Sequence, residues 1–157
     1  MNKFLNTFCL LLLTAGYFSQ NMLNNPVKWQ SSYKDLENSE GEITIIATVD
    51  PGWHLYSQRI NNVGPIPTSF TFSPSKNVQI IGKTEEEGAK EEYEKAFDAK
   101  VYVFTEKAVF KQKIKRNNLN EFSASLSVEY MCCNNVMCLP PKTIQLNVKG
   151  PAISLKK

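Results

Sequence analysis

Three of the four cysteines in this chain fall within seven residues, as Cys132, Cys133 and Cys138, and Pro140 and Pro141 follow them closely. Cysteines so close together can form a redox pair, ligate a metal ion or staple a short loop. The double proline removes two backbone donors and fixes φ, so the segment after Cys138 is expected to be extended and stiff. The choice among the three chemistries depends on the compartment.

The first twenty residues indicate that compartment. Lys3 supplies a positive charge, residues 4–18 form an apolar run, and polar residues follow. This order is typical of a secretory signal peptide, and the run is shorter than the roughly 20 apolar residues of a membrane-spanning helix. We therefore expect residues 1–20 to be a signal peptide. Residues 21–157 are expected to form a soluble domain that is periplasmic or otherwise exported.

Length and charge exclude several classes of protein. The formal net charge of the 157 residues is only +3, which gives no electrostatic footprint for nucleic acid. The chain is about one domain long, and a domain of this size can bury a core without disulfides. The cysteine cluster is therefore not needed simply for stability.

The elements that must position the cysteines have the pattern of short β-strands. Apolar and polar residues alternate over residues 43–49, and Asp50, Pro51 and Gly52 then form a strong turn signal. Several runs of this kind, separated by turn signals, predict an all-β fold, an antiparallel β-sandwich. The further expected strands are residues 53–60, 69–72, 78–81, 101–104, 108–114, 122–131 and 143–148.

One segment, residues 84–100, breaks this pattern because it is dense in charge. Glutamates stand four residues before lysines twice, a spacing that supports a helical turn, whereas Gly88 opposes a long helix. A solvated excursion between two strands is the other interpretation. Tyr93 and Phe97 lie four residues apart here and could turn together toward a common target.

Strand alternation also separates the cysteines. It places Leu126, Val128, Tyr130 and Cys132 on one face and Ser127, Glu129, Met131 and Cys133 on the other. The first face has core composition, so we expect Cys132 to be a buried, inert thiol. We expect Cys133 at the exposed end of the strand, and Cys133 and Cys138 as a candidate disulfide across four intervening residues.

A staple and a zinc site are the competing interpretations. A disulfide that closes a loop of about six residues stabilises a domain by only ~2 kcal/mol, against nearly 5 for a loop of about a hundred. For zinc, the three clustered cysteines and His54 form a formal Cys3His set. Adjacent cysteines point to opposite faces of a strand, so we expect no metal and no cofactor.

Two separated stretches together resemble the N-terminal periplasmic domain of the thiol:disulfide interchange protein DsbD. One is residues 51–58, with its Pro-Gly-Trp-His-Leu-Tyr sequence, and the other is residues 128–143, with a Tyr, paired cysteines and a Cys-Leu-Pro-Pro-Lys-Thr ending. The resemblance implies an immunoglobulin-like sandwich that carries a redox-active cysteine pair. In that family the C-terminal cysteine forms the mixed disulfide, which carries over to Cys138, with Cys133 as the resolving partner.

The resemblance also implies further site residues and partners. The family covers its disulfide with a loop that bears an aromatic residue, and Phe97 is the matching position. The expected active-site neighbourhood comprises Tyr56, Tyr130 and Pro140. Expected partners are periplasmic thioredoxin-like or disulfide isomerase proteins. Because the chain ends soon after the domain, we expect a separate membrane or thioredoxin-like electron donor.

Two features depart from the family and leave a rival function open. Cys132 is an added thiol, and the loop between Cys133 and Cys138 is short. The rival is a noncatalytic exported immunoglobulin-like binding module in which the Cys133–Cys138 disulfide is structural. The sequence leaves the direction of electron flow open.

Overall fold

The computed structural model describes residues 25–59, 64–73 and 75–153, so the predicted signal peptide lies outside the described part. Within these ranges the chain forms strands and no helix, and hence no helix long and apolar enough to cross a membrane. The strands are β1 (Val27–Asp35), β2 (Glu40–Val49), β3 (Trp53–Tyr56), β4 (Ser69–Phe72), β5 (Val78–Glu87), β6 (Lys90–Glu94), β7 (Ala99–Phe104), β8 (Lys107–Arg116), β9 (Phe122–Tyr130), β10 (Cys132–Asn134) and β11 (Lys142–Gly150).

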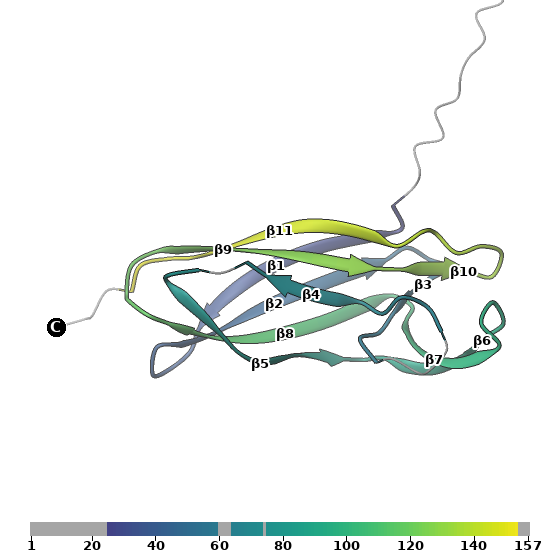
Figure 1. Ribbon diagram of the computed structural model, residues 1–157, viewed down its shortest axis with the longest axis horizontal. Helices are drawn as coiled ribbons and strands as arrows, with labels where there is room; N and C mark the ends of the chain where they lie inside the picture. Colours follow the sequence, from purple (N-terminus) through teal and green to yellow (C-terminus); the bar gives the residue numbers. More distant parts are fainter. Residues whose placement is uncertain (1–24, 60–63, 74, 154–157) are drawn as a thin grey trace, which may run out of the picture.

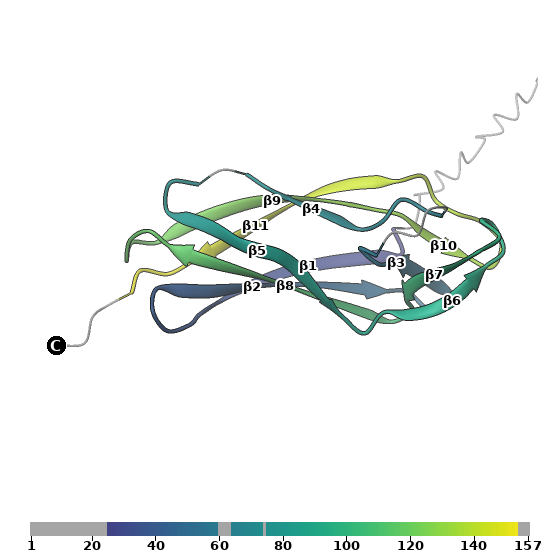
Figure 2. The same ribbon diagram turned by 60° about the horizontal axis from the view of Figure 1, so that its bottom comes forward.

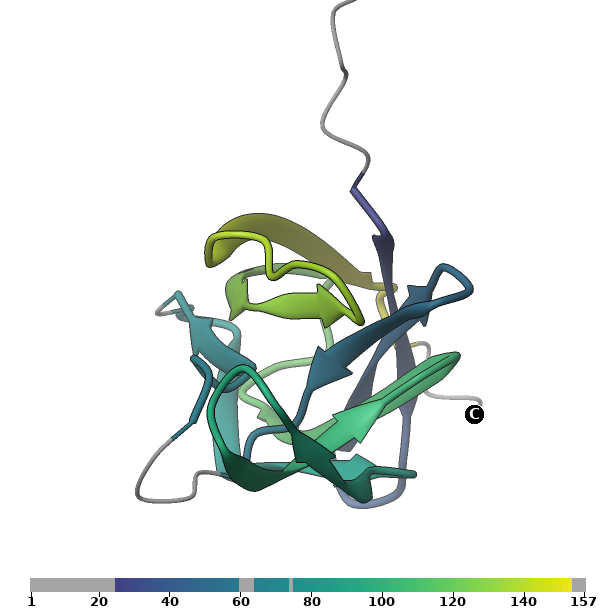
Figure 3. The ribbon, with the colours of Figure 1, turned by 90° about the vertical axis from the view of Figure 1, so that its right-hand side faces the viewer.

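The strands form three antiparallel sheets. The first has the order β1-β2-β8-β5 and the second the order β11-β9-β4, and these two lie over each other as the layers of a sandwich (Figures 1 and 2). The third, β10-β3-β7-β6, lies at one end of the molecule, on the right in Figure 1 and facing the viewer in Figure 3. This end sheet carries the cysteine cluster.

Alternating side chains from both layers fill the core. In β2, Ile43, Ile45 and Ala47 are completely buried, as the period of two in the sequence predicts. Aromatic rings link the layers, because the ring centroid of Phe70 in β4 lies 4.8 Å from that of Phe110 in β8 and 6.3 Å from that of Trp29 in β1. The predicted all-β, immunoglobulin-like antiparallel sandwich is confirmed.

Strand β1 and the strand predicted over residues 53–60 are among those that differ from the sequence-based prediction. Strand β1 was not predicted. Among its inward positions only Val27 is a fully buried aliphatic residue, so the apolar alternation along this strand is weak. The strand predicted over residues 53–60 ends at Tyr56. Beyond it, the Glu86 carboxylate accepts hydrogen bonds from the Ser57 hydroxyl (2.5 Å) and the Gln58 amide (2.9 Å), so this amide is satisfied by a side chain and not by a neighbouring strand.

The charged segment at residues 84–100 contains no helical turn, so that interpretation was wrong. It forms the end of β5, all of β6 and the start of β7. Its charges pair between strands and not along a helix: Glu87 lies 2.6 Å from Lys111, and Glu91 lies 2.7 Å from Lys100. The other interpretation, a solvated excursion between two strands, is right about exposure, because most of these side chains are exposed. The segment itself nevertheless forms strands.

Candidate redox site

The predicted Cys133–Cys138 disulfide is present, and it joins two facing positions of a narrow hairpin. The Leu139 amide donates to the Cys132 carbonyl (3.0 Å) on one side of the pair, and the Asn134 amide donates to the Met137 carbonyl (2.9 Å) on the other. The cysteines thus occupy a non-hydrogen-bonded pair, the position at which antiparallel strands approach most closely. Their Cα atoms lie 4.0 Å apart, which allows the sulfurs to bond.

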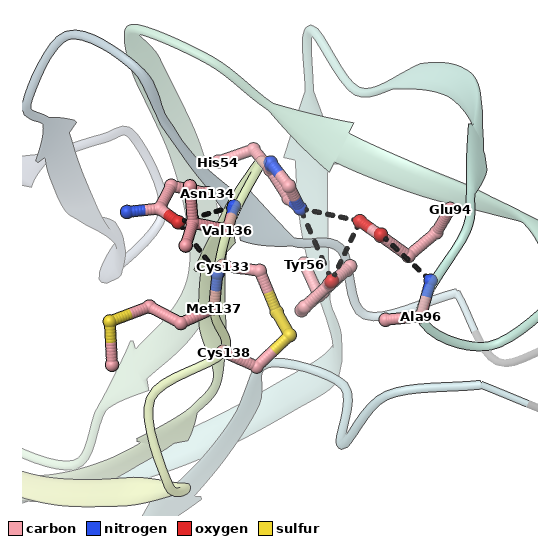
Figure 4. The surroundings of a disulfide bond; sticks show 9 residues. All are labelled: His54, Tyr56, Glu94, Ala96, Cys133, Asn134, Val136, Met137 and Cys138. Carbon is pink, nitrogen blue, oxygen red and sulfur yellow. Dashed lines mark hydrogen bonds and ion pairs between the residues drawn. A yellow bond between two sulfur atoms is a disulfide. The ribbon is translucent and has the colours of Figure 1, made fainter.

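The turn between the cysteines is fixed by the side chain of Asn134. Its Oδ1 atom accepts hydrogen bonds from the amides of Val136 (2.9 Å) and Met137 (2.8 Å). This Asx-type arrangement holds a short loop in one conformation. It also presents two apolar side chains to solvent, since Val136 is 91% exposed and Met137 is 51% exposed. Met137 points away from the disulfide (Figure 4).

The two sulfur-bearing residues differ in exposure. Cys138 is half-buried, whereas Cys133 has an exposed fraction of 0%. The prediction that Cys133 emerges at an exposed strand end was therefore wrong. Cys133 faces His54 across the β10–β3 pair, on the side of the end sheet that other residues cover. An approaching molecule consequently meets Cys138 first.

A small apolar cluster, separate from the main core, surrounds the buried cysteine. Tyr56, Val101 and Val103 form it with Cys133, and Phe97 packs against it from the turn that joins β6 and β7. The Phe97 ring meets the Tyr56 ring edge-on, with centroids 6.2 Å apart. Phe97 therefore packs against the cluster that contains Cys133.

The second aromatic residue of this hairpin behaves differently from the expectation. Tyr93 does not turn toward the cluster together with Phe97, because it is exposed and its hydroxyl donates to Asp98. Residues four apart share a face within one helix or one strand, but here Tyr93 lies in β6 and Phe97 lies in the tight turn that follows it.

Three polar side chains meet beside the cluster (Figure 4). The Glu94 carboxylate lies 2.8 Å from Nε2 of His54 and accepts a hydrogen bond from the Tyr56 hydroxyl (3.1 Å). Burial, together with the Glu94 charge, raises the pKa of Tyr56 above its ordinary value, so this phenol remains a protonated donor.

The sequence did not predict that His54, Tyr56 and Glu94 meet. Alternation over residues 53–56 would have placed His54 and Tyr56 on one face of their strand. Nothing local marked Glu94 among the neighbouring acidic residues, because its position depends on how the hairpin folds back.

Cys132 lies in the main core, as predicted, and is almost completely buried. It faces Leu55 across the β10–β3 pair, on the opposite side of the end sheet from Cys133. Burial raises the pKa of its thiol to about 11. At neutral pH this thiol is protonated and a poor nucleophile.

The structure does not bring Tyr130 and Pro140 into the cluster around the disulfide. Tyr130 belongs to the main core, where its ring lies 5.2 Å from that of Trp29 and its hydroxyl donates to Asn25 (2.9 Å). Pro140 is exposed in the connection between the hairpin and β11. Of the three expected neighbours, Tyr56 alone contacts the cluster.

His54 is engaged with a carboxylate and a phenol, not with the cysteines as a ligand set. Among the residues that the structure describes, no group of three or more histidine, cysteine or acidic side chains could hold a metal ion. The site contains a disulfide between the half-buried Cys138 and the fully buried Cys133.

Comparisons with known proteins agree with this chemistry. The family described as "Thiol:disulfide interchange protein DsbD, N-terminal" matches residues 20–150. The comparison with curated proteins finds no match.

Three solved structures are similar to the chain. The reduced DsbD N-terminal domain of Neisseria meningitidis is 14% identical with a TM-score of 0.51, covering 70% of this chain and 78% of that one. The N-terminal periplasmic domain of ScsB from Proteus mirabilis is 14% identical with a TM-score of 0.56, covering 80% of this chain and 47% of that one. A chain from the complex of the DsbD and PilB N-terminal domains of Neisseria meningitidis is 11% identical with a TM-score of 0.50, covering 76% and 80%. At these identities the likeness shows the fold.

Proposed function

This chain belongs to the family of the N-terminal domain of the thiol:disulfide interchange protein DsbD, and on that premise we propose that it relays electrons through Cys133 and Cys138. The observation that carries the proposal is the asymmetric disulfide. One sulfur belongs to the half-buried Cys138 after a short turn, and the other belongs to the fully buried Cys133, in the cluster against which Phe97 packs. We assign Phe97 as the lid of the site.

In the oxidising half of the cycle, the Cys138 thiolate attacks a partner disulfide and one partner sulfur leaves as a thiolate. The Cys133 thiolate then attacks the Cys138 sulfur, which re-forms the Cys133–Cys138 bond and releases the partner with two electrons and both of its thiols. In the reducing half, a donor dithiol performs the same two displacements in reverse. Cys138 is the nucleophile because its residue is the more exposed of the pair.

The partners we propose are periplasmic thioredoxin-like or disulfide isomerase proteins, with a separate membrane or thioredoxin-like donor. A structural neighbour was determined as a complex of DsbD and PilB N-terminal domains. The family membership and the periplasmic domain of ScsB among the neighbours support an exported location for this chain as well.

A protein partner must bring its own sulfur into bonding distance of Cys138, so it must cover the adjacent turn. Val136, the most exposed large apolar residue of that turn, would be buried by this contact. Val136→Asp should slow exchange with a protein partner by at least about tenfold. The free-energy cost of desolvating an unpaired charge exceeds ~1.4 kcal/mol, and 1.4 kcal/mol corresponds to a factor of ten.

The measurement is the rate at which reduced thioredoxin reduces the oxidised protein, followed by the loss of the disulfide. Reduction by dithiothreitol should be unchanged, since a small reductant need not cover the turn. Leu36→Asp is the matched control, because Leu36 is also an exposed apolar residue but lies in the turn after β1 at the opposite end of the sandwich (Figure 1). Equal rates for Val136→Asp and the parent with thioredoxin would contradict this docking surface.

A further inference from the structure

Glu94 occupies an unusual place for a carboxylate in this hairpin. It ends β6, and its side chain is only 15% exposed, whereas Glu91 and Glu92 of the same strand are exposed to solvent. A partly buried carboxylate is tolerated when it is hydrogen-bonded and paired. Glu94 meets this requirement by reaching to β3, where it contacts His54 at 2.8 Å and the Tyr56 hydroxyl at 3.1 Å.

The same residue also shapes the turn that carries the lid. Its second carboxylate oxygen accepts a hydrogen bond from the Ala96 amide (3.3 Å), and its backbone carbonyl accepts one from the Phe97 amide (3.2 Å). Glu94 therefore directly connects the backbone of the turn that carries Phe97 to β3. Tyr56 completes the connection, because its hydroxyl donates to Glu94 while its ring packs on the Phe97 ring.

The other side-chain hydrogen bonds of β6 act within the hairpin, whereas β7 is joined to β3 by backbone pairing. Glu91 pairs with Lys100 of β7, and Tyr93 donates to Asp98 in the turn. These contacts brace the hairpin but do not attach it to β3. In the part of the chain that the structure describes, the polar contacts between β6 and β3 are those of Glu94.

We propose that Glu94, Tyr56 and His54 form a latch that holds the Phe97 lid closed over the Cys133–Cys138 disulfide. The latch rests on the proposed function, because it regulates access to the same exchange site. The three residues are positioning residues, since none of them exchanges sulfur. For Phe97 to leave Cys133, the Glu94 carboxylate must separate from both β3 side chains, so the latch sets how often the site opens to a reductant.

The test measures the rate at which a small phosphine reduces the oxidised protein and its latch variants. Glu94→Gln keeps the shape of the side chain but removes its charge, and Tyr56→Phe keeps the ring but removes the donor. Each should accelerate reduction, by about tenfold for Glu94→Gln, because charge-assisted hydrogen bonds are stronger than neutral ones. Glu91→Gln is the matched control and should leave the rate unchanged, since that carboxylate pairs with Lys100 on the exposed side of the hairpin.

A double-mutant cycle with Phe97→Ala separates a latch from a general loss of stability. Without the Phe97 ring there is no lid to hold, so adding Glu94→Gln to Phe97→Ala should produce no further acceleration. A change in overall stability would instead accelerate reduction in both backgrounds, and that result would overturn the latch.

The same experiment distinguishes the latch from the lid on which it rests. If Phe97→Ala accelerates reduction but neither Glu94→Gln nor Tyr56→Phe does, the latch is wrong and the lid stands. If Phe97→Ala itself leaves the rate unchanged, the lid of the proposed function fails and the latch fails with it. Circular dichroism of each variant verifies that the sandwich is folded, and two latch variants keep the test decisive if one of them is not.

Discussion

Cys133→Ser should accumulate mixed disulfides with partner proteins, whereas Cys138→Ser should accumulate few or none. The half-buried Cys138 is the residue that a partner reaches, and the buried Cys133 supplies the thiolate that releases the partner. Without that second thiolate the complex has no resolving step and persists. We expect a nearly all-or-none difference in adducts between the two variants.

Both variants should also carry Cys132→Ala, because the neighbouring thiol could otherwise resolve the complex in place of Cys133. The proteins are exported, quenched with acid to protonate free thiolates, and compared on a nonreducing gel. The single variant Cys132→Ala serves as the control and should show no adducts. Adducts that appear only with Cys138→Ser would reverse the assignment of the nucleophile.

Phe97→Ala should accelerate reduction of the oxidised protein by small thiols about tenfold. The phenylalanine ring packs on Tyr56 and on the cluster that contains Cys133. Full burial of such a side chain contributes ~1.5–3 kcal/mol, so the partly buried Phe97 should contribute about 1.4 kcal/mol, which corresponds to about a factor of ten. The rate is followed by trapping free thiols at intervals after dithiothreitol is added.

Tyr93→Ala is the matched control for the lid. It removes an aromatic side chain from the same hairpin, but Tyr93 is exposed and contacts Asp98, not the cluster. Its rate of reduction should equal that of the parent. If Phe97→Ala and Tyr93→Ala behave alike, Phe97 does not shield the disulfide.

Much of the fold could be predicted because alternation is a local property of the sequence. The buried positions of β2 and β9 follow from the period of two, and so does the burial of Cys132 in the main core. Strand β1 was not predicted because its inward positions mix apolar residues with Ser31, which weakens the alternation of apolar and polar residues. The charged hairpin was ambiguous because its opposite charges can pair along a helix or across two strands.

The site was harder to predict, since its geometry depends on contacts between distant segments. The disulfide is local, so the short spacing between Cys133 and Cys138 was sufficient to predict it. The burial of Cys133 was not local, because residues of β3 and β7 and the lid turn cover it. The place of Glu94 opposite His54 likewise follows from the folding of the hairpin, and no short sequence pattern records it.

The short loop also bears on the rival function, a binding module with a structural staple. A disulfide that closes about six residues stabilises by only ~2 kcal/mol on the chain-entropy model. The main core already contains most of the buried apolar side chains of the described residues, on the far side of the end sheet from Cys133. We therefore propose that the disulfide serves exchange and not stability.

The reduction potential of the Cys133–Cys138 pair distinguishes an exchangeable disulfide from a structural one. The purified Cys132→Ala protein is equilibrated with defined thiol–disulfide buffers, quenched with acid, and assayed for the fraction that is oxidised. Structural disulfides have potentials below about −300 mV, and exchangeable ones lie higher. We predict a value above about −300 mV, and a value clearly below it would contradict electron relay and favour a fixed staple.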